Sequence, residues 1–229
     1  MRFFLDTANL RDLQEGISWG IFSGVTTNPV LMSKESSDYE GLAQRILDVV
    51  PGDWDISLPV RSDSPEAMVA QARVLAAWSQ KVRVKFPATV QGLKAASQLI
   101  GEFSLNMTII KSPAQAMLCM GLLDELGSGD LVVSVFCGRL RQAGHDWQQV
   151  VETLANTKSR AKILAASIKT SADISDAIGA GADIITAPLD VYQGAMSSPL
   201  VNEDSEIFDR AFDEQGLQVP GLVRLKDYE

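Results

Sequence analysis

Short apolar runs alternate along this chain with longer stretches in which apolar residues recur every three to four positions. The short runs have the length and period-two pattern of β-strands, and the longer stretches have the period of amphipathic helices. The predicted strands are Phe3–Asp6, Gly24–Thr27, Trp54–Leu58, Val82–Phe86, Ser104–Thr108, Leu131–Phe136, Lys162–Ala165 and Ile184–Thr186. The helical stretches include Pro65–Gln80, Val90–Ile100, Pro113–Leu126, Trp147–Asn156 and Ala172–Gly179.

This alternation predicts an α/β fold, a (β/α)8 TIM barrel that spans residues 1–229 as a single domain. A doubly wound open sheet is the alternative, but no Gly-x-Gly-x-x-Gly motif follows the first strand. The pattern also predicts an additional C-terminal helix over Asn202–Gly216. The tail, Leu217–Glu229, is a candidate for packing on a neighbouring subunit.

A barrel of this kind carries its active site at the C-terminal ends of the strands. Polar residues at or just beyond those ends are therefore the candidates for chemistry. They are Asp6, Thr26, Asn28, Lys85, Asn106, Thr108, Arg139, Ser167 and Lys169. Because they come from different strands, sequence spacing alone would not pair them.

Lys85 is the most informative of these residues, because it closes the alternating apolar run Val82–Pro87. A lysine at the edge of the barrel could extend its ammonium to solvent. If it is buried, desolvation lowers the pKa of the amine and makes it a nucleophile that can form a Schiff base with a carbonyl. Residues that end the other strands favour the second interpretation.

Carboxylate and amide groups at the other strand ends could assist such a lysine. Asp6 could cap the following helix, or it could face Lys85 and transfer protons. Thr26 and Asn28 share side-chain parity, and Asn106 and Thr108 repeat that spacing. Such uncharged groups can hydrogen-bond the hydroxyls of a sugar.

Cations follow the late strands, where TIM barrels commonly bind phosphate. Arg139 follows the sixth strand, and Ser167 and Lys169 follow the seventh. They are candidates for a phosphate site, and the alternative is solvated surface charge. His145 could serve as a base, or it could lie at the start of the following helix.

Composition narrows the class of function. The chain has 229 residues and a net charge of −9 without a basic run, which argues against nucleic acid or an anionic membrane as a partner. We expect both cysteines, Cys119 and Cys137, to be reduced core residues in the cytoplasm. Asp6 comes too early for a signal peptide, and no apolar stretch is long enough to span a membrane. The single histidine argues against zinc, whereas a magnesium site of scattered carboxylates stays open.

Taken together and in this order, the motifs resemble the transaldolase family, in particular its short-chain branch with fructose-6-phosphate aldolase. The matching segments are Phe3–Asn9, Gly24–Pro29, Val84–Pro87 with Gly92 and Leu93, Asn106–Thr108, Gly138–Leu140 with Gly144–Asp146, and Ala165–Lys169. The resemblance extends from about Met1 to Phe208.

The resemblance implies a class I mechanism that uses neither a cofactor nor a metal. Lys85 would attack the carbonyl of a ketose, with Asp6 handling protons and Thr108 as a further catalytic residue. The implied substrate-binding residues are Thr26, Asn28, Asn106 and Phe136, and the implied phosphate ligands are Arg139, Ser167 and Lys169. It also implies sugar-phosphate substrates and a homo-oligomer, a pentamer or decamer.

Asn106 and Phe136 match the transaldolase pattern, because the aldolase branch has an apolar residue at the first position and a tyrosine at the second. The resemblance therefore favours transfer of a three-carbon dihydroxyacetone unit over its release. Release by an aldolase is the alternative.

Pro59 departs from the family, which has a glutamate or glutamine there to hold the catalytic water. Proline has no polar side chain and no N–H, so we expect the third strand to end or bulge at this residue. Without this glutamate or glutamine, the protein could also be a transaldolase paralogue with altered substrates or weak activity. Three further positions depart from the family: Arg61, Val30 and Lys111. Arg61 could reach the C-terminal end of the barrel, or it could lie on the surface.

Overall fold

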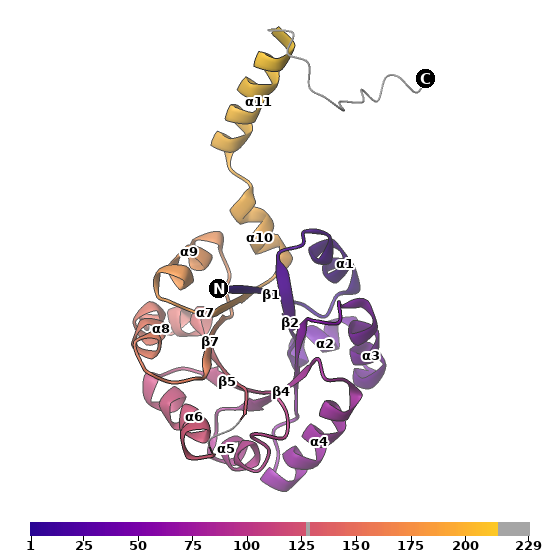
Figure 1. The fold of residues 1–229 in the computed structure, drawn as a ribbon, viewed down its shortest axis with the longest axis vertical. Helices are drawn as coiled ribbons and strands as arrows, with labels where there is room; N and C mark the ends of the chain where they lie inside the picture. The colour runs from indigo at the N-terminus through magenta and orange to yellow at the C-terminus, as the bar shows by residue number, and fades with distance from the viewer. Residues whose placement is uncertain (127–128, 215–229) are drawn as a thin grey trace. The chain divides into compact units, whose positions relative to one another are not determined.

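A computed structural model describes residues 1–126 and 129–214 of the chain. Their parallel strands close into a barrel in the order β1 to β8, and helices surround it (Figure 1). The strands are β1 Arg2–Asp6, β2 Phe22–Thr26, β3 Asp55–Pro59, β4 Val82–Pro87, β5 Leu105–Ile110, β6 Leu131–Phe136, β7 Lys162–Ala166 and β8 Ile184–Ala187. The predicted TIM barrel is confirmed, and every predicted strand overlaps an observed one.

The predicted helices are present, although several end one to three residues earlier than expected, and some strands are followed by two helices. They are α1 Leu10–Ser18, α2 Pro29–Glu35, α3 Tyr39–Val49, α4 Pro65–Trp78, α5 Val90–Ser97, α6 Pro113–Leu126, α7 Cys137–Gln142, α8 Trp147–Ala155, α9 Ser171–Gly179, α10 Leu189–Met196 and α11 Pro199–Glu214. Both α2 and α3 follow β2, because Asn28 caps α2, Ser36 is extended and ends it, and Asp38 caps α3.

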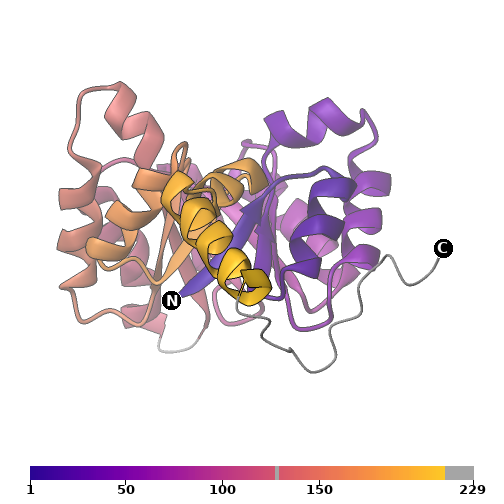
Figure 2. The ribbon, with the colours of Figure 1, turned by 90° about the horizontal axis from the view of Figure 1, so that it is seen from above.

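Alternation along the strands separates a barrel interior from an outer layer. The outward side chains pack with the helices, which flank the strands in the side view (Figure 2). A smaller cluster of inward side chains fills the barrel itself. Its members are Phe4, Val132, Leu164, Ala166 and Ile184, with Phe136 packed against them. Toward the C-terminal strand ends, many inward positions are polar, and this end of the barrel forms the mouth.

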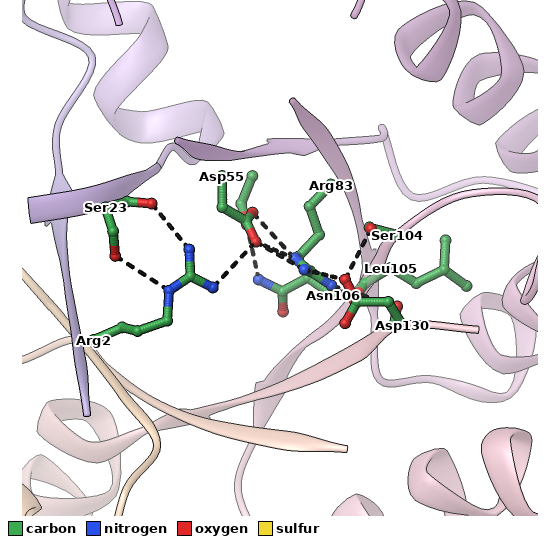
Figure 3. Close-up of polar contacts among 9 residues, drawn as sticks. Arg2, Ser23, Asp55, Arg83, Ser104, Leu105, Asn106 and Asp130 are labelled. Atoms are coloured by element: carbon green, nitrogen blue, oxygen red, sulfur yellow. Dashed lines mark hydrogen bonds and ion pairs between the residues drawn. The ribbon is translucent and has the colours of Figure 1, made fainter. Parts of the chain in front are cut away.

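An ion cluster occupies the opposite, N-terminal end of the barrel (Figure 3). Arg83 of β4 is 5% exposed, and its guanidinium pairs with Asp55 and Asp130. It also donates a hydrogen bond to the carbonyl oxygen of Leu105 at 3.1 Å. Arg2 approaches Asp55 from the other side, with an N–O distance of 3.9 Å. These partners offset the cost of burying the charge of Arg83. The cluster closes this end of the barrel, which we call the floor.

The C-terminal part of the chain forms a separate compact unit. Residues 1–192 make up the first unit, and the described part of residues 193–229 belongs to the second. Within it, α11 has exposed apolar side chains, among them Leu200, Ile207, Phe208 and Phe212. The predicted helix over Asn202–Gly216 is present as α11 up to Glu214, and the predicted tail, Leu217–Glu229, lies outside the described residues. That the chain is one domain, and that it forms a homo-oligomer, stay predictions.

Among the described residues, no helix combines the length and the apolar character that a bilayer crossing requires.

The Arg83 cluster makes a stability prediction. Arg83→Met leaves Asp55 buried beside the weaker contact from Arg2, so we expect the free energy of unfolding to fall by about 3 to 5 kcal/mol. Urea denaturation monitored by circular dichroism measures this loss.

Arg73→Met is the matched control, because Arg73 pairs with Glu102 while its side chain is 57% exposed. Water screens the attraction in an exposed pair, so this variant should unfold nearly as the native protein does. Equal losses in the two variants would contradict a structural role for the floor cluster.

Candidate active site at the barrel mouth

Lys85 lies inside the barrel near the C-terminal end of β4. It faces the same way as Arg83, two residues earlier, and only 6% of it is exposed. Its Nζ atom donates a hydrogen bond to the carbonyl oxygen of Thr27 at 2.9 Å. The ammonium therefore does not extend to solvent, and the buried interpretation of this lysine is the one the geometry favours.

Burial moves both members of the Asp6–Lys85 pair toward their neutral forms. Desolvation raises the pKa of Asp6, although Lys85, the Thr26 hydroxyl and Lys169 oppose the rise. Desolvation likewise lowers the pKa of Lys85, and the charge of Asp6 opposes that fall. A neutral amine is the nucleophilic form of lysine, so the site favours the state that carbonyl addition needs.

Asp6 is held by hydroxyl groups from neighbouring strands. Thr26 donates a hydrogen bond to Oδ1 of Asp6 at 2.8 Å, and its oxygen lies 2.7 Å from the hydroxyl of Thr186 on β8. The cap of α1 is Asn9, which accepts from the backbone N–H groups of Arg11 and Asp12. The alternative that Asp6 caps this helix is therefore wrong.

Asn106 is in register with Lys85 on the adjacent strand and is completely buried. Its Nδ2 atom donates to the Ser57 hydroxyl at 3.2 Å, and Ser134 donates to its Oδ1 atom at 2.7 Å. These serines orient the amide between β3 and β6. Sequence reasoning missed both, although each is a polar residue inside an otherwise apolar strand.

Thr108 follows Asn106 on the same face of β5 and is 9% exposed. Its hydroxyl oxygen is the one buried side-chain polar atom of the described residues that lacks a hydrogen-bond partner. An unpaired buried hydroxyl costs free energy, which suggests a group available to a ligand.

Asn28 follows the end of β2 and Phe136 is the last residue of β6, but the two have different roles in the fold. The Oδ1 atom of Asn28 accepts hydrogen bonds from the backbone N–H groups of Val30 and Leu31, both at 3.0 Å. Contact with a ligand would therefore use its amide nitrogen. Phe136 is half-buried and packs against the barrel interior.

The start of α7, which directly follows β6, and the loop after β7 come together where the phosphate site was predicted. The backbone N–H of Gly138 donates to the carbonyl oxygen of Ser167 at 3.1 Å. A Cβ atom at Gly138 would lie 2.2 Å from that oxygen and 3.3 Å from Cγ of Lys169, so only glycine fits. Ser167 has a φ of 60°, a left-handed conformation that is unusual for serine.

Arg139 and Lys169 are exposed at this point, and Arg139 bonds to Gln142 at 3.2 Å. The carboxylate of Asp173 fixes the second loop: it accepts from the backbone N–H groups of Lys169 and Thr170 and pairs with Arg141. The structure thus places these cations on α7 and on the adjacent loop after β7, while a phosphate-binding role stays a prediction.

Some candidates lie away from the buried pair. His145 is exposed, and α8 is capped by Asp146 rather than by His145. Arg61 is exposed, in line with its interpretation as a surface residue. The part of the chain that the structure describes contains no cluster of His, Cys, Asp or Glu side chains suited to a metal ion.

Proteins already known share the sequence features of this chain. The family model described as transaldolase/fructose-6-phosphate aldolase matches residues 3–221. The chain belongs to the transaldolase/fructose-6-phosphate aldolase family. A protein of Dehalococcoides mccartyi named "Probable transaldolase" is 38% identical over 208 residues, which cover 88% of this chain and 93% of that protein. A "Probable transaldolase" of Symbiobacterium thermophilum is 38% identical over 213 residues, which cover 91% and 95%.

Solved structures of low sequence identity share the fold. A 3-hexulose-6-phosphate synthase from Salmonella typhimurium has a TM-score of 0.57 at 15% identity and covers 82% of this chain and 87% of its own. A thiamine phosphate pyrophosphorylase from Pyrococcus furiosus has a TM-score of 0.52 at 10% identity, with 82% and 85% covered.

Pro59 stands at the position where the family resemblance predicts a glutamate or a glutamine. It is the last residue of β3 and lies in register with Lys85. The pairing of β2 with β3 extends only to Thr26 and Ser57, so the missing N–H of Pro59 costs no hydrogen bond on that side. Strand β3 ends at Pro59, so the expected end of the third strand is confirmed. Alternation along β3 points the apolar ring of Pro59 into the barrel, in register with Lys85.

The Asp6–Lys85 pair makes a prediction about pH. Asp6 raises the pKa of Lys85, so Asp6→Asn should lower that pKa further and increase the neutral amine at any pH below it. Carbon-13 NMR of labelled lysine Cε atoms, with Lys85→Ala to assign the signal, measures the midpoint of titration.

Asp53→Asn removes the same charge at an exposed position and should leave the Lys85 midpoint unchanged. An Asp6→Asn midpoint equal to or above the native one would show that Asp6 does not act on this amine.

Proposed function

We propose that this enzyme is a Schiff-base transaldolase that transfers a three-carbon dihydroxyacetone unit between phosphorylated sugars. The observation that carries the proposal is the buried amine of Lys85, bonded to the Thr27 carbonyl and coupled to Asp6. Membership in the family supports an aldolase or transferase, and the strand-end geometry supplies a nucleophile and a proton carrier.

In the first half of the proposed reaction, neutral Lys85 adds to the carbonyl carbon of a ketose phosphate. The carbinolamine loses water to give an iminium ion, and Asp6 is placed to move the protons. Asp6 then takes the proton of the C4 hydroxyl as the C3–C4 bond breaks. The aldose phosphate leaves, and the bonding electrons stay on a three-carbon enamine attached to Lys85.

In the second half, the enamine carbon attacks the aldehyde of an acceptor aldose phosphate, and the new alkoxide takes the proton from Asp6. Water then hydrolyses the iminium ion, which releases the new ketose and restores Lys85. Arg139, Ser167 and Lys169 are proposed to hold the phosphate, because the start of α7 and the adjacent loop after β7 carry two cations and a hydroxyl.

An aldolase that releases dihydroxyacetone is the second candidate. Release requires a proton on the enamine carbon in place of an acceptor. Phe136 brings a ring without a hydroxyl to the mouth, and Pro59 brings an apolar ring, so neither can help water to donate that proton. Phe136 therefore favours transfer, whereas Pro59 removes the water-holding group from either reaction.

Trapping tests the proposed nucleophile. Borohydride added to the protein with a ketose phosphate should reduce the imine and leave a three-carbon adduct on Lys85, located by peptide mass spectrometry. Lys85→Ala should show no adduct. Native protein without an adduct for a panel of ketose phosphates would contradict the proposal.

A coupled assay without an acceptor separates the two candidate activities. Transfer predicts product formation only when an aldose phosphate is present, whereas sustained dihydroxyacetone release without it would favour the aldolase.

Pro59 leads to a prediction about rate. A missing proton-handling group typically costs about 10²- to 10⁴-fold, so Pro59→Glu should raise turnover of ordinary transaldolase substrates by at least about tenfold if no other group replaces it. Pro59→Leu is the control, since it removes the ring without adding a carboxylate. High native turnover that Pro59→Glu does not increase would show that another group has taken over.

A further inference from the structure

Thr186 is a buried polar residue on the inward face of β8, beside the polar side chains of the mouth. It is 1% exposed, and the inward residue before it on β8, Ile184, belongs to the cluster that fills the barrel. Valine would have nearly the same shape and would avoid burying a hydroxyl, so packing alone does not account for threonine. The hydroxyl has a partner, because its oxygen lies 2.7 Å from that of Thr26.

The direction of this hydrogen bond follows from the chemistry of the groups. An ionised carboxylate can only accept, so the single hydroxyl proton of Thr26 is donated to Asp6. Thr186 must then donate its own proton to the oxygen of Thr26. The result is a chain from β8 through β2 to β1, in which every donor points toward Asp6.

Such a chain does more than fill space. A hydroxyl that accepts a hydrogen bond becomes a stronger donor, so Thr186 strengthens the bond from Thr26 to Asp6. It also fixes the rotation of the Thr26 hydroxyl, which would otherwise be free to turn away from the carboxylate.

We propose that Thr186 is a positioning residue that holds Asp6 in its ionised, proton-accepting form by orienting the hydroxyl of Thr26. This inference rests on the proposed function of Asp6 as the proton carrier. It assigns no contact with substrate to Thr186, and it places the support of the base on β8, the strand beside β1.

Other groups act on Asp6 and stay in place when Thr186 is changed. Lys85 on β4 and Lys169 after β7 both act on its charge. Tyr192 on α10 also interacts with Asp6, and its hydroxyl bonds to the carbonyl oxygens of Phe4 and Ile185, both at 3.0 Å. A change seen in Thr186 variants therefore reports the hydroxyl chain.

The first test is a titration that needs no activity. In protein labelled with carbon-13 at the aspartate carboxyls, Asp6→Asn assigns the Asp6 signal. Thr186→Val should raise the midpoint of Asp6, because the hydrogen bond to its ionised form weakens, and Thr186→Ser should restore it toward the native value.

The second test is kinetic. Since ionised Asp6 is the active form, the acid limb of the kcat profile should move to higher pH in Thr186→Val, with kcat near neutral pH reduced by about tenfold or more and KM changed by less than about twofold. Thr186→Ser should recover most of the rate.

Thr7→Val is the matched control. Thr7 is 5% exposed, and its hydroxyl donates to the carboxylate of Asp12 at 3.1 Å, so the variant also loses a buried hydroxyl-to-carboxylate bond. It should leave the Asp6 midpoint and the kcat profile unchanged even if it lowers the melting temperature.

An Asp6 midpoint that is the same in native protein and Thr186→Val, or an equal shift in Thr7→Val, would overturn the inference. Failure of the proposed function gives a different result, because native protein would then form no borohydride adduct at Lys85. An adduct on native protein with an unchanged profile in Thr186→Val would refute the role of Thr186 alone.

Discussion

The structure of the mouth depends on one buried amine. Lys85 is placed inside a closed barrel, where an ammonium is poorly solvated, and a backbone carbonyl from β2 and the carboxylate of Asp6 are what offset this cost. Both ionisable groups have pKa values displaced toward their neutral forms. Such a pair is displaced toward its uncharged form and can exchange protons readily. Imine chemistry requires this property of its nucleophile and its base.

One strand carries two buried cations with different surroundings. Arg83 and Lys85 face the same way on β4, but Arg83 is paired with Asp55 and Asp130 at the floor. A guanidinium keeps its proton in almost any environment and suits a multiply bonded structural cluster, whereas an amine loses its proton when it is desolvated. The floor therefore neutralises its charge with paired acids, and the mouth leaves Lys85 with a single carboxylate acting on it.

The sides of the mouth differ in their capacity to move protons. On the β3 side, Pro59 lies in register with Lys85 and supplies only carbons. On the β1 side, the hydroxyls of Thr186 and Thr26 lead to Asp6, whereas the unpaired hydroxyl of Thr108 lies on β5, across the barrel from β1. This asymmetry concentrates proton handling on Asp6, and it gives Thr186 a role that the sequence did not indicate.

The sequence by itself determined the barrel, because period-two strands alternating with amphipathic helices have few other arrangements, and it identified Lys85, Asp6 and Asn106 as polar residues at strand ends. It could not assign Asp6 to the mouth rather than to a helix cap, since that depends on Asn9 taking the cap. Nor could it find Ser57, Ser134 or Thr186, whose partners lie on other strands. Tertiary structure decided these roles, because closure of the barrel sets the neighbours of each inward side chain, and hydrogen bonds depend on those neighbours.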